Sequence, residues 1–152
     1  MKNKNDKWPE ILGFDLQTLK VQDLPGLEKT KSGEAPTGET FSVYSGPIKH
    51  WCFDEITLTT WDHAGGYPNH ILLHSENGEN MGDAGLHLTE VLGEAEEIDQ
   101  ENYCWRNNQL YLQLTMEDDF ELEIYLRRQV ELESKEFRQL FYTPTIPQSE
   151  RV

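Results

Sequence analysis

The sequence has 152 residues, with 28 acidic and 13 basic side chains and a formal net charge of −15 at pH 7. This length suits one domain, and a hydrophobic share of 36% that includes four tryptophans argues against a disordered chain. The negative charge argues against nucleic acid and anionic membranes as partners, because both are recognised through positive charge.

The N-terminal residues, MKNKNDKWPE, contain no apolar core of the kind that secretory signals carry. No apolar run reaches the length of a membrane span. We therefore expect a cytoplasmic protein whose single domain covers residues 1–152. Its two cysteines, Cys52 and Cys104, each adjoin a tryptophan, which favours buried, reduced thiols over a disulfide.

Residues 32–41, SGEAPTGETF, share the glycine spacing of a phosphate-binding loop but not its chemistry. That motif is G-x-x-x-x-G-K-[ST], and Glu39 stands here in place of the lysine that reaches the phosphates. No apolar run precedes the glycines, and the residues that follow, TFSVYSGP, alternate as a strand does. The sequence therefore predicts a connecting loop without a nucleotide site, and no motif calls for a cofactor.

Strands are predicted in WCFDEITLTTWD, residues 51–62, and in NHILLHSE, residues 69–76. His70 and His74 have the H-x-x-x-H spacing of some zinc sites, but on a strand they lie roughly 13 Å apart and cannot bind one ion. The other histidines are scattered, and no metal site is expected.

The loop between these strands, WDHAGGYPNH, carries Trp61, His63 and Tyr67. One interpretation is a plain hairpin loop that packs one aromatic ring inward. The other is a recognition loop, because tryptophan and tyrosine are frequent anchors of protein interfaces.

A helix is predicted over residues 84–92, where Leu86, Leu88, Val91 and Leu92 form an apolar stripe. Asp83 is expected to cap the helix and Gly93 to end it. An acidic loop should follow, and then a strand within ENYCWRNNQ, residues 101–109.

The clearest pattern is strict alternation over residues 110–116 and 120–132, which predicts two strands with one buried face. Glu117, Asp118 and Asp119 join them as a tight turn. Two prolines follow, and the tail over residues 143–152 is expected to fray.

The two halves of the chain, residues 8–76 and 84–132, resemble each other in part. WPEILG in the first half matches LTEVLG in the second, and Trp51 with its following strand matches Trp105 with its own. An internal duplication and a chance echo both fit this pattern.

Residues 86–130 resemble the helix–strand–hairpin module of beta-lactamase inhibitor protein and of small bacterial immunity proteins, which neutralise toxins. The resemblance rests on a Leu-Gly stop, a tryptophan and the alternation that follows. It implies an immunity protein, and with the predicted elements it favours an α+β fold. We expect a mainly antiparallel sheet with a few short helices on one face.

The function expected from the sequence is non-catalytic binding of a basic protein, with a toxin blocked by occlusion. The expected anchors are the aromatic residues of the 61–67 loop, and an acidic rim should steer the partner. The candidate partner-binding residues are Trp61, His63, Tyr67, Glu94, Glu96, Glu97, Glu117, Asp118 and Asp119.

Three alternatives stay open. The acidic residues could serve only as a solubilising surface. The chain could be a small-molecule-binding or regulatory domain that uses a concave sheet face. It could also be an enzyme of unknown type, although no G-x-S-x-G nucleophile motif is present and adjacent carboxylates carry little information in so acidic a chain.

Overall fold

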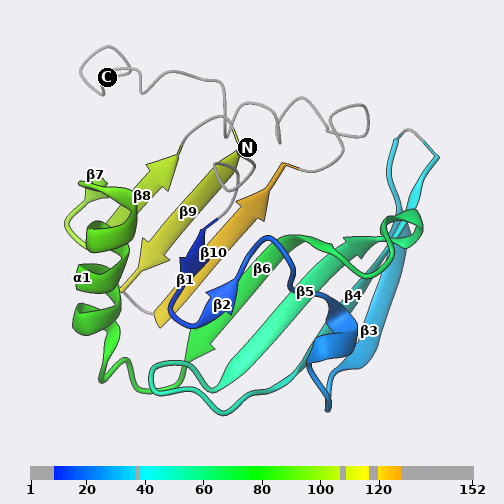
Figure 1. Cartoon of the computed structure of the whole chain (residues 1–152), viewed down its shortest axis with the longest axis horizontal. Coiled ribbons are helices and arrows are strands. Elements are labelled where there is room, and N and C mark those ends of the chain that lie inside the picture. Colours follow the sequence, from blue (N-terminus) through cyan, green and yellow to red (C-terminus); the bar gives the residue numbers. More distant parts are fainter. Residues whose placement is uncertain (1–8, 37, 107–108, 117–119, 128–152) are drawn as a thin grey trace.

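The computed structural model of the chain describes residues 9–36, 38–106, 109–116 and 120–127. Its main feature is an eight-stranded antiparallel sheet with the strand order β3-β4-β5-β6-β10-β9-β8-β7 (Figure 1). The strands are β3 (Glu28–Glu34), β4 (Thr40–Pro47), β5 (Glu55–Trp61), β6 (Pro68–Ser75), β7 (Glu96–Asp99), β8 (Asn102–Arg106), β9 (Leu110–Thr115) and β10 (Phe120–Leu126).

The sheet consists of two four-stranded meanders, β3 to β6 and β7 to β10, joined where β6 pairs with β10. At the middle of this junction Leu72 lies opposite Glu123. Helix α1 (Met81–Leu92) connects the two meanders. Both halves thus have the same strand order, while their origin by duplication stays a prediction.

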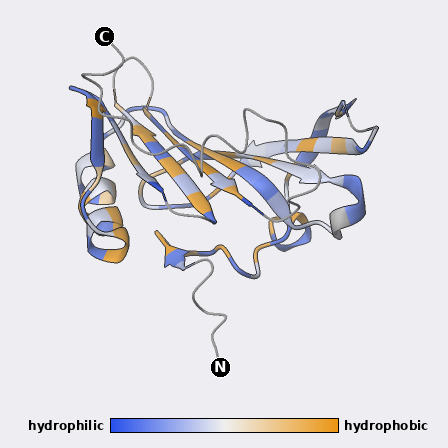
Figure 2. Cartoon of the chain, turned by 90° about the horizontal axis from the view of Figure 1, so that it is seen from above, coloured by the Kyte–Doolittle hydropathy of each residue, from blue (hydrophilic) through white to orange (hydrophobic). Residues whose placement is uncertain are grey.

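The core lies on one face of the sheet, because alternate side chains of the central strands point to that side. Its fully buried strand residues are Ile56, Leu58, Ile71, Leu73, Leu110, Leu112, Leu114, Leu122, Ile124 and Leu126. Helix α1 packs on this face through Met81, Ala84 and Leu88. Figure 2 shows α1 on the same side of the sheet as the short hairpin of β1 (Glu10–Ile11) and β2 (Phe14–Asp15).

The predicted mainly antiparallel sheet is therefore confirmed, but the second layer differs from the prediction. The described residues form one α-helix, and the rest of that layer is the β1–β2 hairpin with the 3₁₀ turn η2 (Val21–Asp23). WPEILG matches LTEVLG in sequence but not in structure. LTEVLG lies at the end of helix α1, whereas Glu10 and Ile11 of WPEILG form strand β1.

His50 and His87 hold the turn of this hairpin against the core. Leu12 is buried and has a φ of 51°, next to Gly13 with a φ of 90°. Its carbonyl oxygen accepts a hydrogen bond from Nε2 of His50 (2.7 Å), and its N–H donates to Nε2 of His87 (3.0 Å). Both imidazoles therefore have structural partners on the backbone.

The predicted helix is confirmed, although it starts at Met81 rather than residue 84. Asp83 is not its cap, because Asn80 occupies that position and Asp83 lies in the first turn. A carboxylate there interacts favourably with the positive end of the helix dipole. Gly93 ends the helix as predicted, with a φ of 95° and its N–H bonded to the Thr89 carbonyl (2.9 Å).

The predicted strands over residues 110–116 and 120–132 correspond to β9 and β10 as far as Leu126. Residues 128–132, the turn over 117–119 and the tail over 143–152 lie outside the described part of the chain. The loop predicted over residues 32–41 is shorter in the structure, because residues 32–34 belong to β3 and residues 40–41 to β4. Its described residues between these strands are 35, 36, 38 and 39.

Two strands of the eight-stranded sheet were not expected from the sequence. β3 and β7 are the two edges of the sheet, and most of their residues are exposed. An exposed edge strand has no buried face and is commonly charged, so it lacks the apolar alternation that reveals the central strands.

Candidate partner-binding site

The aromatic loop predicted to contact a partner is held by contacts within the molecule. The Trp61 ring packs edge-on against Phe41, with centroids 6.1 Å apart, and stacks with His63 at 6.5 Å. The ammonium of Lys20 lies 5.0 Å from the centre of the Tyr67 ring. Trp61 and Tyr67 are each partly buried.

The same loop is tied down through its backbone. It contains the 3₁₀ turn η3 (Asp62–Ala64) and two glycines with positive φ, Gly65 and Gly66. The Gly66 carbonyl accepts the Val21 N–H of η2 at 2.9 Å. These contacts support the interpretation of a packed hairpin loop.

The acidic residues of the prediction lie at a different place. Glu94, Glu96 and Glu97 lie on or just before β7, the edge strand, and β5 with the aromatic loop is five strands away. Five steps at about 4.8 Å put these two groups roughly 24 Å apart. Glu117, Asp118 and Asp119 lie outside the described residues. The structure therefore does not bring the predicted residues into one site.

A groove is lined by residues of α1, β7, β8 and β9, and we call it the α1–β7 groove. Figure 1 shows α1 beside the edge of the sheet that β7 and β8 form. Its volume is about 530 Å³. It is lined by Met81, Gly82, Gly85, Leu86, Thr89, Glu94, Ala95, Glu97, Tyr103, Trp105, Leu114 and Met116. Two of the predicted acidic residues, Glu94 and Glu97, thus belong to an apolar groove.

Two glycines one helical turn apart leave the groove open on the side of α1. A Cβ atom on Gly82 would meet no atom within 4 Å, and one on Gly85 would lie 3.4 Å from Cδ2 of Leu114. Leu86, the residue after Gly85, also lines the groove and is 66% exposed. The groove is therefore an accessible surface of the described chain rather than a closed void.

The floor of the groove is fixed by Trp105. Its indole N–H donates to the Gly93 carbonyl at 2.8 Å, so the ring links β8 to the end of α1. The side chain is only 5% exposed, so most of its ring packs within the core beneath the groove.

The chain segment that contributes most of the groove carries acidic residues and no lysine or arginine. Residues 50–105 contain no lysine or arginine, although they make up more than a third of the chain. The same stretch has twelve acidic residues: Asp54, Glu55, Asp62, Glu76, Glu79, Asp83, Glu90, Glu94, Glu96, Glu97, Asp99 and Glu101. The first basic residue after it, Arg106, lies 3.5 Å from Glu96 as an ion pair. Helix α1 and β7 therefore present a strongly anionic, apolar-lined surface.

The opposite face of the sheet carries a polar cluster centred on Glu123. Oε2 of this carboxylate accepts hydrogen bonds from Nε2 of His70 and from the Tyr125 hydroxyl, each at 3.2 Å. The bond from His70 lowers the pKa of Glu123, and burial raises the pKa of Tyr125 to about 12. The carboxylate is thus held ionised by its neighbours.

The two histidines with zinc-like spacing serve different carboxylates. His70 contacts Glu123, and His74 lies 3.7 Å from Asp54. Within the described ranges, no group of three or more histidine, cysteine or acidic side chains is arranged to hold a metal ion.

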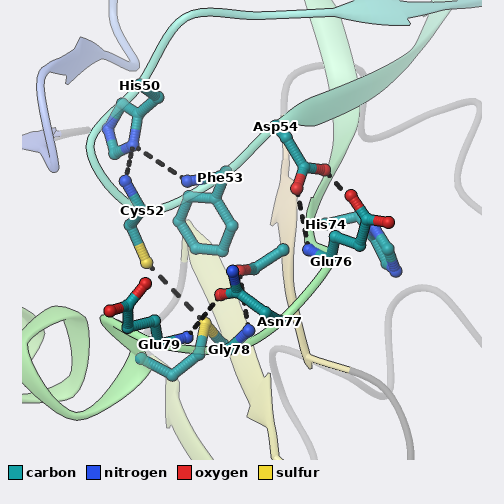
Figure 3. A network of polar contacts seen from close by, with 11 residues as sticks. His50, Cys52, Phe53, Asp54, His74, Glu76, Asn77, Gly78 and Glu79 are labelled. Atoms are coloured by element: carbon teal, nitrogen blue, oxygen red, sulfur yellow. Dashed lines mark hydrogen bonds and ion pairs between the residues drawn. The ribbon is translucent and has the colours of Figure 1, made fainter.

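Both thiols are in settings that suppress nucleophilic chemistry. The Cys52 sulfur lies 3.7 Å from the Met81 sulfur. Figure 3 shows His50 beside Cys52 and Phe53, whose backbone N–H groups donate to its Nδ1. Cys104 lies 3.6 Å from the Glu96 carboxylate. Burial raises the pKa of each thiol to about 11, so neither forms a thiolate readily at neutral pH.

A second cavity, of about 520 Å³, lies beside the β1–β2 hairpin. It is lined by Gly13, Phe14, Leu24, Pro25, Pro47, Ile48, Lys49 and His50. Its wall is mostly apolar, and the His50 ring that borders it is already bonded to the backbone.

Comparisons with protein-family models, curated proteins and solved structures found no match to this chain. In the part of the chain that the structure describes, no helix is long and apolar enough to cross a membrane. The candidate site therefore rests on its own geometry. This groove was not predicted from the sequence, and the signals that could have indicated it are the two glycines inside α1 and the absence of lysine and arginine from 50 to 105.

Proposed function

We propose that this chain is a non-catalytic protein-binding module that recognises a basic protein through the α1–β7 groove. The observation that carries the proposal is an accessible apolar groove bordered by Glu94 and Glu97, inside a stretch without lysine or arginine. Apolar walls supply affinity at short range, and surrounding acidic charge accelerates the encounter with a positive partner.

We propose further that the module is a cytoplasmic immunity protein, which blocks a toxin by occlusion. A protein that acts on nucleic acid or on an anionic membrane needs a positive surface to bind its substrate. An acidic module that covers this surface inhibits by exclusion, without a cofactor or a chemical step. The partner is then a basic protein, and neither nucleic acid nor membrane binds the module itself.

Affinity capture followed by an activity assay tests this function. A protein captured by the wild-type chain should lose its activity when one equivalent of the chain is added. The variant Glu94→Lys/Glu97→Lys should lose capture and inhibition. The matched control, Glu28→Lys/Glu34→Lys on the exposed edge β3, changes the net charge equally and should retain both. Binding that leaves the partner fully active would contradict the immunity function.

A second candidate function is small-molecule binding, favoured by the cavity beside the β1–β2 hairpin. Its volume of about 520 Å³ and its apolar wall fall within the range of ligand pockets. A rise in the thermal midpoint with one compound of a metabolite panel, lost in Phe14→Ala, would favour this candidate over protein binding.

A further inference from the structure

We infer that the α1–β7 groove receives one large apolar side chain from a partner segment that carries basic residues on both sides of it. This inference rests on the proposed binding of a basic protein and specifies the recognition element. It is argued from the shape of the groove, from the residues that keep it open and from the charge at its rim.

The groove is large enough to admit an aromatic or large aliphatic side chain, and its volume of about 530 Å³ leaves room for neighbouring atoms of the partner segment. An aromatic side chain suits such a site because it buries roughly 150–250 Å² of surface. Trp105, Leu114 and Met116 lie among its lining residues, which offers an inserted ring apolar contacts on several sides. An anchor of this kind is where interfaces concentrate their binding energy.

The glycines of α1 keep this space empty at the expense of the helix. Glycine inside a helix is less favourable than alanine, because it loses more backbone freedom when the helix forms. A methyl group at Gly82 would meet nothing, and one at Gly85 would make ordinary contact with Leu114. Packing and helix propensity both favour a larger residue here, and glycine preserves the opening.

The rim selects the charge of the segment. Glu94 and Glu97 line the groove and are exposed, and α1 and β7 contain no lysine or arginine. Lysine or arginine on either side of the anchor would meet these carboxylates, whereas acidic neighbours would be repelled. A second copy of this chain is a poor occupant, because it would bring the same acidic surface against itself.

Nuclear magnetic resonance of the full, ¹⁵N-labelled chain tests this inference with three short capped peptides. The probes are Lys-Lys-Phe-Lys-Lys, Lys-Lys-Ala-Lys-Lys and Glu-Glu-Phe-Glu-Glu, titrated at millimolar concentration. The amide signals of Gly82 and Gly85 and the indole signal of Trp105 report directly on the groove. We expect the basic phenylalanine peptide to shift all three signals and the other two peptides to leave them unchanged.

Two variants separate the groove from general charge effects. Gly85→Leu fills the groove and should weaken binding of the phenylalanine peptide by tenfold or more. Leu86→Ala removes an exposed wall residue that the core does not need, so its fold should be preserved while binding weakens several-fold. Spectra that match the wild type away from the groove identify correctly folded variants.

The inference is overturned if the alanine or acidic peptide shifts the groove signals equally, if no peptide shifts them, or if self-association of the chain shifts them. Its failure is distinguishable from failure of the proposed function. If a captured toxin binds Gly85→Leu normally but does not bind Glu94→Lys/Glu97→Lys, the apolar anchor is refuted and the proposed function still holds. If the peptide binds in the groove but no captured partner is inhibited, the proposed immunity function is refuted and the apolar anchor still holds.

Discussion

The orientation of the His50 ring is set by its hydrogen bonds to the backbone. Its Nδ1 accepts two backbone N–H groups, so the proton lies on Nε2, which donates to the Leu12 carbonyl. The sequence alone showed only a scattered histidine. Its structural role depends on a loop and a hairpin 38 residues apart, a contact that local patterns do not reveal.

His50→Ala should destabilise the chain by about 2–3 kcal/mol, because the Leu12 carbonyl and the N–H groups of Cys52 and Phe53 lose three hydrogen bonds of roughly 1 kcal/mol each. Urea unfolding followed by tryptophan fluorescence measures this change. The control His63→Ala, on a side chain that is 40% exposed, should change the free energy of unfolding by less than about 0.5 kcal/mol. Equal effects of the two variants would contradict the structural role of His50.

The thiols were predicted from the sequence to be buried, and the structure confirms this. Since burial raises the pKa of both Cys52 and Cys104 to about 11, the native chain should not react with a thiol reagent such as dithionitrobenzoate at pH 8. Two equivalents should react in denaturant. Rapid labelling of one thiol in the native state would instead indicate an activated cysteine and favour an enzyme.

Glu123 should make stability depend on acid pH. Its pKa is lowered in the folded chain, so its contribution is present above the unfolded value, about 4.3, and is lost as pH falls through the folded value. Glu123→Gln should therefore flatten the loss of unfolding free energy between about pH 5 and pH 3. Glu55→Gln, an exposed residue of β5, is the control. An unchanged acid profile in Glu123→Gln would refute this linkage.

Individual elements were predictable where one face is buried and the other is not. The alternation in β9 and β10 led to correct strands, because the core contacts one side of each strand. The predicted apolar stripe led to a correct helix but not to its buried face, since Leu86 and Val91 are exposed and α1 packs through Met81, Ala84 and Leu88. The edge strands β3 and β7 were missed for the complementary reason. Their charged residues suit exposed edges, where they discourage pairing with other chains.

The helix offers a direct test of the glycine argument. Gly82→Ala should stabilise the chain by about 0.5–1 kcal/mol, since its φ is ordinary and a Cβ there meets no atom. Gly93→Ala should destabilise it, because φ at this position is 95°. Thermal unfolding of both variants measures these two changes in stability. A destabilising Gly82→Ala would mean that the groove wall is tighter than the structure shows.

At the level of the whole molecule, the sequence predicted an acidic binding surface but not its layout. Pairing of β6 with β10 sets the final strand order, and strands so distant in sequence carry no local signal of their partnership. That order separates the aromatic 61–67 loop from Glu94, Glu96 and Glu97. It also gathers two of these carboxylates, Glu94 and Glu97, beside a groove that no short motif encodes.

The central claim is that the acidic surface around the α1–β7 groove steers a basic partner into place. The Debye length falls from about 30 Å at 0.01 M salt to about 8 Å at 0.15 M, so steering should weaken over this range. The most direct test is surface plasmon resonance of a captured partner across a salt series. Three chains are compared: wild type, Glu94→Gln/Glu97→Gln and the control Glu28→Gln/Glu34→Gln. We expect the association rate of wild type and of the control to fall steeply with salt, and the groove variant to associate slowly with a shallower dependence. An association rate independent of salt, or equal effects of the two double variants, would contradict the claim.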